Sequence, residues 1–226
     1  MTGYEAQRIA MVESQVRPNE VTDPALLRAM RTLPRERFVL PAFQKLAYMD
    51  ESIEVFPSID GAPARYLLSP MVQARLIQLA EVEPGDNVLD VGCATGYATA
   101  ILAQLAATVI GLEPEPELAQ AAREALIGLG LANAGIVEGP LAAGRPAEGP
   151  YDVIVLEGSV AEVPESLLAQ LTDGGRLVAV VTSRPNMRQG KANLFVRVGD
   201  ELSGVAHFDA GAYPLPGFVP APSFVF

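Results

Sequence analysis

The segment "VLDVGCATGYATA", residues 88–100, constrains the fold more than any other part of the chain. A strand-like apolar run ends in Asp90, and Gly92 and Gly96 then frame a turn that opens a helix at about Tyr97. Glycines let the backbone approach a ligand closely and take φ values denied to other residues. The free amide groups of the helix N-terminus point at the same place. The segment therefore predicts a strand, a ligand-binding turn and a helix in direct succession.

Strand-like and helical patterns alternate along the chain after Asn87. Short apolar runs occur in "NVLDVG", "TVIGLEP", "AGIVEG", "YDVIVLEG" and "GGRLVAVV", and helical segments such as "YATAILAQLA" and "PELAQAAREALIGLG" separate the first of them. This alternation predicts βαβ units and a parallel sheet in an α/β fold. Two later β-rich runs meet at Gly199 and Asp200, a pair typical of a hairpin turn, so an antiparallel edge is expected at the C-terminal end.

The chain before Asn87 reads mainly as helices and loops. Apolar residues at helical spacing predict a helix over residues 4–17. Thr22 or Asp23, followed by Pro24, predicts the start of a second helix, and Pro70 opens a third. The stretch "DESIEVFPSIDGAP" between them is expected to be a loop or a weak strand.

Two regions and a tail are expected. Residues 1–80 should form an N-terminal helical extension, and residues 81–226 should form the α/β domain, packed together as one compact unit. The tail "DAGAYPLPGFVPAPSFVF" is too stiff for a flexible linker and too apolar to be left solvated. We expect it either to pack across the body of the protein or to mediate a homodimer.

Charge and composition exclude several function classes. The formal net charge of −11 repels a phosphate backbone, so no nucleic-acid partner is expected. No apolar run reaches the roughly 20 residues that span a bilayer, so we expect a cytoplasmic protein without a membrane partner. With one cysteine and one histidine, no Cys/His metal cluster can form. The segment around His207 contains no nucleophile elbow, which argues against a Ser-His-Asp triad.

An acidic residue lies about twenty residues beyond the glycine turn, which suits a nucleoside site. Glu113 ends the second strand, where its carboxylate can accept hydrogen bonds from both ribose hydroxyls. The turn lacks the glycines of a dinucleotide site, because Ala94 and Ala98 occupy two of those positions. The Asp90 carboxylate also suits a cationic aminoacyl group better than an anionic pyrophosphate. These features favour S-adenosylmethionine as the cofactor.

Two simpler interpretations of the turn remain open. The glycines could serve packing alone, without a ligand. Cys93 lies at a helix N-terminus, which can lower a thiol pKa, but no histidine is nearby to act as a base. We therefore interpret Cys93 as a small residue that lines the loop rather than as a nucleophile.

These elements together resemble the protein-L-isoaspartate O-methyltransferase family, on the class I methyltransferase fold. "MVESQVRPNEVTDPALLRAMRTLPRERFV" is similar to the N-terminal helices of that family, and "YDVIVLEGSVAEVPESLLAQLTDGGRLVAVV" resembles its later strands. The resemblance extends from about Met11 to Val181. It implies a Rossmann-like fold with a mostly parallel seven-stranded sheet, helices on both faces and an antiparallel C-terminal edge strand.

The resemblance also implies an activity and a set of site residues. Members transfer the methyl group of S-adenosylmethionine to the carboxylate of L-isoaspartyl residues in damaged proteins or peptides, and the methyl ester collapses to a succinimide. Such a reaction needs alignment rather than a strong base, because the acceptor carboxylate is already ionised near neutral pH. The implied cofactor-binding residues are Asp90, Gly92, Cys93, Ala94, Gly96, Glu113, Pro114, Gly139, Pro140 and Leu141, and no metal is implied.

The segment before Pro70 departs from the family pattern "GqtISqP". Aligned on Pro70, this chain reads "ARYLLSP", so Leu68 replaces the serine that lies close to the transferring methyl group and Tyr66 replaces the threonine. Ser69 is directly before the proline. It is either the N-cap of the following helix or a displaced catalytic hydroxyl, and the N-cap is the simpler interpretation.

A second departure follows the third strand of the α/β region. The family's "GDG" appears here as "EGPLAAG", so Pro140 replaces the aspartate that faces the adenine amino group. The missing hydrogen bond is worth roughly 0.5–1.5 kcal/mol, which lowers affinity by about tenfold at most. Three functions stay open: isoaspartyl repair, methyl transfer to another acceptor, and a catalytically silent relative that binds the cofactor or a protein partner.

Overall fold

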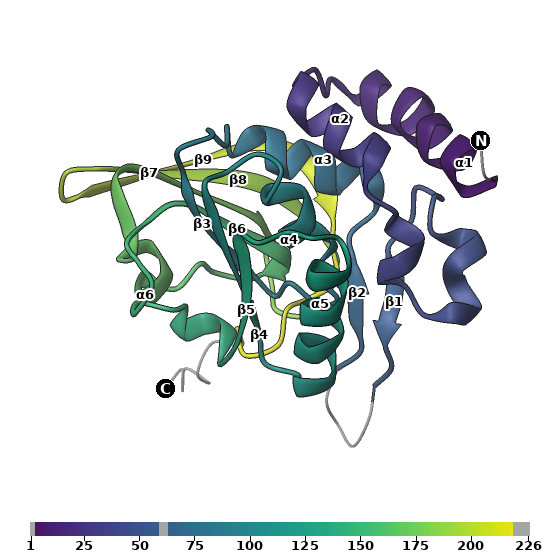
Figure 1. Ribbon diagram of the computed structural model, residues 1–226. Helices are drawn as coiled ribbons and strands as arrows, with labels where there is room; N and C mark the ends of the chain where they lie inside the picture. Colours follow the sequence, from purple (N-terminus) through teal and green to yellow (C-terminus); the bar gives the residue numbers. More distant parts are fainter. Residues whose placement is uncertain (1–2, 59–62, 219–226) are drawn as a thin grey trace.

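The centre of the molecule is one twisted sheet. The computed structural model describes residues 3–58 and 63–218. The sheet consists of β3 (Asn87–Val91), β4 (Thr108–Glu113), β5 (Ala134–Glu138), β6 (Tyr151–Val160), β7 (Leu171–Val181), β8 (Gln189–Val198) and β9 (Glu201–Gly211). The order across it is β5-β4-β3-β6-β7-β8-β9 (Figure 1). Strands β3 to β7 pair in parallel, and the β8–β9 hairpin adds the antiparallel edge, so the predicted fold class is confirmed.

Several of the helices begin at a proline, as the sequence predicts. They are α1 (Gly3–Met11), α2 (Pro24–Thr32), α3 (Pro70–Leu79), α4 (Tyr97–Leu102), α5 (Pro116–Gly128) and α6 (Glu165–Leu168). A π turn over Val12–Val16 continues α1, so the helix predicted over residues 4–17 is confirmed with a change of geometry. The Asp23 carboxylate accepts a 2.7 Å hydrogen bond from the Leu26 amide, which confirms this N-cap. Short 3₁₀ helices connect the rest, at Arg17–Asn19, Arg35–Phe38, Pro41–Leu46 and Leu141–Ala143.

Both faces of the central strands β3 and β6 are buried, whereas most side chains of β9 are exposed. Side chains alternate along each strand, so Val88 and Val153 belong to one apolar cluster while Leu89 and Ile154 belong to another on the opposite face. The first cluster also contains Met11 and other residues of the N-terminal helices. The N-terminal extension therefore packs directly onto the sheet.

A two-stranded sheet precedes α3, and the sequence predicts it only in part. Strand β1 (Ile53–Phe56) pairs antiparallel with β2 (Arg65–Leu67). The first strand lies in the stretch that reads as a loop or weak strand, whereas "RYL" reads as a helix start and is a strand. Along β2 the residues alternate, with Arg65 and Leu67 buried and Tyr66 half-buried. A charged side chain is thereby directed into the molecule.

The described part of the C-terminal tail packs across the body. Pro214 forms a parallel bridge with Ser159 near the end of β6, and Ala212, Leu215 and Phe218 are buried. This confirms body packing for residues 212–218. The rest of the tail, residues 219–226, lies outside the described residues.

The topology brings the C-terminal ends of strands β3, β4 and β6 together. After β3 the chain adds β4 and β5 on one side, and it then returns to place β6 on the other side of β3. Ligands of open α/β sheets bind at such a reversal, outside the carboxyl ends of the strands. Here these ends carry the glycine turn after β3, Glu113 at the end of β4 and Glu157 in β6.

Candidate functional site

The turn between β3 and α4 has the backbone conformation that its glycines predict. Gly92 and Gly96 have φ values of 82° and 88°, and Ala94 between them takes a left-handed φ of 49°. The Gly92 and Cys93 amides both donate to the Leu112 carbonyl of β4, at 2.8 and 3.2 Å. The turn is therefore held against β4, the strand that carries Glu113.

Glu113 faces this turn, as the resemblance implies. Its Oε2 accepts a 2.8 Å hydrogen bond from the Ala94 amide, and its Oε1 accepts one of 3.2 Å from the Glu115 amide. The side chain has no exposed surface. Two backbone donors thus fix the carboxylate beside the glycine turn.

Arg65 of β2 reaches into the same place. Its guanidinium forms an ion pair with Glu113 through Nη1 and donates through Nη2 to the Gly92 carbonyl at 3.1 Å. The Arg65 side chain is only 5% exposed, so both charges are buried. In the family pattern aligned on Pro70, Arg65 stands at the glutamine position. This alignment is the only feature of the sequence that points to Arg65, and it does not predict the ion pair with Glu113.

The tail covers the turn from another side. A Cβ on Gly92 would lie 2.7 Å from Leu215 Cδ2 and 3.5 Å from Leu141 Cδ1. Ser159 exchanges backbone hydrogen bonds with Tyr213 and Leu215, each 2.9 Å long. The ring of Tyr213 stacks on Tyr66, with centroids 3.5 Å apart and planes 7° from parallel.

The residues for a nucleoside cofactor are present, but their arrangement does not fit a bound ribose. Both oxygens of Glu113 are already hydrogen-bonded, one of them to Arg65. Leu215 fills the space in front of Gly92.

Other predicted cofactor residues surround the same turn. Gly139 donates its amide to the Glu113 carbonyl at 3.3 Å, and Pro140 is exposed at the start of the Leu141–Ala143 turn. Leu141 is buried against Gly92. The structure therefore brings the glycine turn, Glu113 and the residues after β5 together, and their role in cofactor binding remains a prediction.

Cys93 is buried in the turn. Its burial raises the pKa of the thiol well above the usual value, and the nearby Asp90 and Glu113 carboxylates raise it further. The thiol is 1% exposed. A protonated, inaccessible thiol is a poor nucleophile, which agrees with Cys93 as a small residue lining the loop.

A cluster of buried polar side chains lies on the side of the sheet that faces α3 and α4. Asp90 accepts a 2.5 Å hydrogen bond from Thr99 of α4, and Glu157 accepts one of 3.0 Å from Gln73 of α3. Burial raises the pKa of Asp90 to about 7, with the Thr99 hydrogen bond lowering it and the Glu113 charge raising it. Burial also raises the pKa of Glu157, and the Asp90 charge adds to this. Asp90 Oδ1 has no hydrogen-bond partner among the described residues.

This raised pKa predicts a pH dependence of stability. Between the unfolded value near 4 and the folded value of about 7, the folded protein binds more protons at Asp90 than the unfolded chain does. The free energy of unfolding should therefore fall as pH rises over this window, by up to about 1.4 kcal/mol per pH unit. Urea denaturation of the wild type and Asp90→Asn at several pH values checks this, since the variant should lose that part of the slope. Parallel pH profiles for the two proteins would contradict it.

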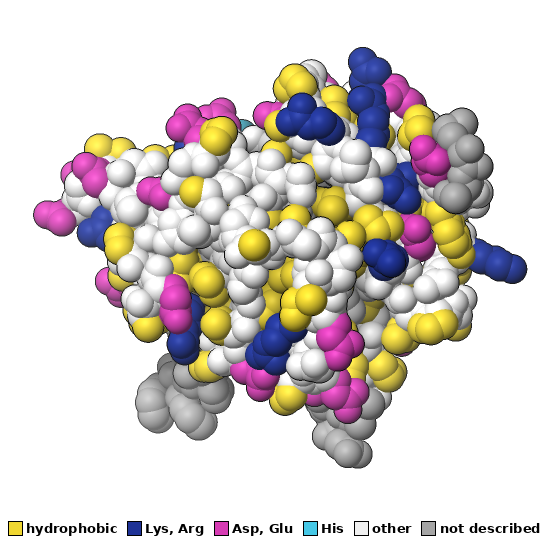
Figure 2. Space-filling model, in the orientation of Figure 1, with side chains coloured by type: hydrophobic (Ala, Val, Ile, Leu, Met, Phe, Trp, Pro, Cys, Tyr) yellow, Lys and Arg dark blue, Asp and Glu magenta, His cyan; other side chains and the backbone are white. Residues whose placement is uncertain are grey.

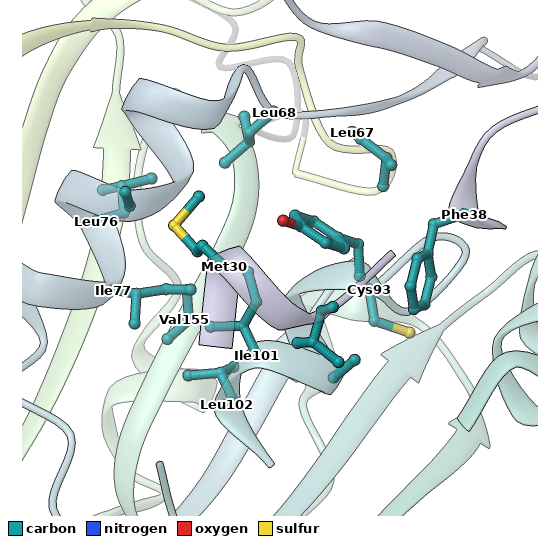
Figure 3. Close-up of a cluster of buried hydrophobic side chains, with 14 of the residues drawn as sticks. Met30, Phe38, Leu67, Leu68, Leu76, Ile77, Cys93, Ile101, Leu102 and Val155 are labelled. Carbon is teal, nitrogen blue, oxygen red and sulfur yellow. The ribbon is translucent and has the colours of Figure 1, made fainter. Parts of the chain in front are cut away.

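Leu68 and Ser69, in the segment directly before α3, have different surroundings. Leu68 is 2% exposed and belongs to the apolar cluster that contains Met30 and Leu76, part of which is drawn in Figure 3. Its carbonyl accepts a 2.7 Å hydrogen bond from the buried Arg35 guanidinium. Ser69 occupies the N-cap position of α3, but its side chain makes no capping hydrogen bond. Ser69 is therefore the N-cap residue, as predicted, but its hydroxyl does not form the hydrogen bond expected of a cap. A catalytic role of Ser69 remains a prediction.

The two N-caps predict different effects of substitution. Asp23→Ala removes a bonded cap and should lower the free energy of unfolding by about 1 kcal/mol. Ser69→Ala removes no capping bond and should change it by less than about 0.5 kcal/mol. Urea denaturation measures both. A larger loss for Ser69→Ala than for Asp23→Ala would show that the Ser69 hydroxyl has a partner in solution.

Within residues 3–58 and 63–218, no group of three or more His, Cys, Asp or Glu side chains is placed to hold a metal ion. The single histidine, His207, is an exposed residue of β9. The polar groups that the structure brings together at the glycine turn are the Glu113 carboxylate, backbone amides of the turn and the Arg65 guanidinium.

Comparison with known proteins assigns the chain. It matches the protein-L-isoaspartate(D-aspartate) O-methyltransferase family over residues 6–209. It is 36% identical to a protein-L-isoaspartate O-methyltransferase of Koribacter versatilis, over 81% of this chain and 80% of that protein. It is 38% identical to a second such protein, from Pelobacter propionicus, over 80% of this chain and 78% of that one.

Solved structures share the fold. One, of a protein-L-isoaspartate O-methyltransferase, superposes with a TM-score of 0.79 at 24% identity, covering 95% of this chain and 67% of that one. Another, a putative Plasmodium falciparum member in complex with S-adenosyl-L-homocysteine, gives 0.73 at 20% identity, covering 93% and 98%. The match over residues 6–209 and the identity of more than a third with curated members decide the assignment. The chain belongs to the protein-L-isoaspartate(D-aspartate) O-methyltransferase family.

Proposed function

We propose that this chain is an S-adenosylmethionine-dependent methyltransferase that methylates the carboxylate of L-isoaspartyl residues in damaged proteins and peptides. Membership of the family over residues 6–209 supports this activity. The curated relatives carry the name of the same enzyme, and one related structure holds S-adenosyl-L-homocysteine. Neither another acceptor nor a silent relative gains support from these comparisons.

One structural observation carries the proposal. The Glu113 carboxylate is fixed beside the glycine turn by the Ala94 and Glu115 amides, at the point where the strand order reverses. A carboxylate at the end of the second strand is the usual partner of ribose hydroxyls in this class of sheet.

A labelled methyl assay tests the activity. The protein is incubated with methyl-labelled S-adenosylmethionine and either an isoaspartyl peptide or the same peptide with a normal aspartyl residue. Label on the isoaspartyl peptide well above the aspartyl control is expected. Equal, background-level label on both peptides would reject isoaspartyl methylation.

The remaining expectations about partners stay proposals. No helix in the described part of the chain is both long enough and apolar enough to cross a membrane. The net charge is −11, and Figure 2 shows basic side chains in small groups among acidic and apolar ones on the visible face. The negative charge argues against a nucleic-acid partner, and a protein or peptide substrate is proposed from the family membership. A cytoplasmic location and a homodimer through the tail are likewise proposed, and light scattering would measure the oligomeric state.

A further inference from the structure

Arg65 is a side-chain partner of Glu113, beside two backbone donors. A carboxylate has about four lone-pair sites, and the structure fills three of them, two with backbone amides and one with the guanidinium. The Ala94 amide belongs to the glycine turn, and the Glu115 amide belongs to the N-cap residue of α5, directly after β4. Arg65 comes from a strand 48 residues earlier in the chain. Ribose hydroxyls can donate to Glu113 in its place.

Leu215 and Arg65 block the same glycine. Measured from a Cβ placed on Gly92, Leu215 Cδ2 lies at 2.7 Å and Arg65 Nη2 at 3.4 Å. Arg65 also donates to the Gly92 carbonyl at 3.1 Å. Two segments far apart in the sequence therefore converge on the backbone that a cofactor would approach.

A pair of tyrosines joins these two segments. Tyr66, the residue after Arg65, stacks on Tyr213, two residues before Leu215. The Arg188 guanidinium lies over the Tyr213 ring, 3.9 Å from its centroid. Movement of either segment breaks the stack, so displacement of Arg65 and displacement of the tail are coupled.

The tail is held at the site by few backbone hydrogen bonds. Leu215 donates to Ser159 and Tyr213 accepts from it, both at 2.9 Å, and Ala212 donates to Arg188 at 2.8 Å. Among the described residues, the buried side chains of Leu215 and Phe218 and the Tyr213 stack add to these bonds. Displacing this segment would break these three hydrogen bonds and expose Ala212, Leu215 and Phe218, while β6 keeps its pairing with β3 and β7.

We propose that Arg65, Tyr213 and Leu215 form a cover, and that the cover closes the nucleoside site at Glu113 and must be displaced before an adenosine-containing cofactor binds. The cover regulates the site of the proposed function and rests on that function for the identity of the ligand. Removing Arg65 from Glu113 makes room for ribose and should strengthen cofactor binding. A residue that belonged to the bound site would do the opposite.

Calorimetry with S-adenosyl-L-homocysteine tests the cover. We compare the wild type with Arg65→Gln and Leu215→Ala, and with Arg176→Gln as the matched control. Arg176 pairs with Asp86 at 2.6 Å, just before β3 begins and away from the glycine turn. The two cover variants should bind at least tenfold more tightly than the wild type, and the control should bind like the wild type. Weaker binding by both cover variants would overturn the proposal, and so would the failure of every variant to bind.

Hydrogen exchange of the wild type gives a second readout that needs no substitution. Saturating S-adenosyl-L-homocysteine should slow exchange at the turn, residues 90–99, and speed it at residues 212–218. Slower exchange at both segments would overturn the cover, because the tail would then close over the ligand. If Arg65→Gln does not fold, hydrogen exchange of the wild type and calorimetry of Leu215→Ala still test whether the cover blocks the cofactor.

The labelled methyl assay on the same variants separates the cover from the proposed function. Tighter binding without methylation of the isoaspartyl peptide supports the cover and rejects isoaspartyl transfer. Methylation of that peptide with unchanged binding in Arg65→Gln and Leu215→Ala supports the activity and rejects the cover.

Discussion

Replacing Glu113 by alanine is expected to lower the free energy of unfolding by about 3–5 kcal/mol, because it leaves the buried Arg65 guanidinium without its counter-charge. The Arg65 and Glu113 side chains are 5% and 0% exposed, so water cannot replace the lost partner. The Ala94 and Glu115 amides lose their acceptor as well. The same variant should lose binding of S-adenosyl-L-homocysteine. Urea denaturation and calorimetry measure the two effects.

Two comparisons show whether the unpaired, buried Arg65 charge causes the loss of stability in Glu113→Ala. Adding Arg65→Met to Glu113→Ala removes the unpaired cation and should recover much of the lost stability. Asp209→Ala breaks the exposed Lys191–Asp209 pair, whose side chains are 60% and 73% exposed, and should change stability by less than about 1 kcal/mol. If Glu113→Ala destabilises no more than Asp209→Ala, the ion pair is not buried in solution.

Leu68→Ser restores the residue of the family pattern and is expected to destabilise the protein by about 3 kcal/mol or more. Leu68 is 2% exposed in the apolar cluster with Met30 and Leu76 (Figure 3). Serine would leave a cavity there and bury a hydroxyl among apolar side chains. Urea denaturation measures the loss.

The neighbouring substitution Ser69→Ala is the matched control for this prediction, since it also changes a buried residue of the same segment. It should leave the free energy of unfolding nearly unchanged, because the Ser69 side chain makes no capping bond. Leu68→Ser with wild-type stability and raised methyl transfer would contradict the packing role. It would show that position 68 faces the acceptor, as the serine of the family pattern does.

The strand, turn and helix around Gly92 could be predicted from the sequence because their signals are local. The glycines at 92 and 96 take the positive φ values that such a turn requires. Glu113 follows at the spacing of one βαβ unit and faces the turn. The parallel sheet follows from the alternation of strands and helices and the antiparallel edge from the hairpin at Gly199, whereas the strand order is visible only in the structure.

The partner of Glu113 could not be predicted in the same way. Arg65 lies 48 residues before it, in a three-residue strand whose letters also suit a helix start. Nothing local in "RYL" indicates that its first side chain is buried or which carboxylate it meets. Only the pairing of β1 with β2 and its position beside the sheet decide this.

The role of the tail depends on tertiary contacts too. Its stiff, apolar composition predicts packing on the body, which the structure confirms for residues 212–218. Composition does not say that Leu215 meets Gly92 or that Tyr213 meets Tyr66. The glycine turn and Glu113 are thus readable from the sequence, whereas the contacts of Leu215 and Tyr213 beside them are visible only in the folded chain.

A crystal structure of the wild-type protein with S-adenosyl-L-homocysteine tests the account most directly. The ribose hydroxyls should bond to Glu113, which keeps its bonds from the Ala94 and Glu115 amides, and the Arg65 guanidinium and Leu215 side chain should lie away from Gly92. A ligand bound elsewhere, with Arg65 still paired to Glu113, would contradict the assignment of this site.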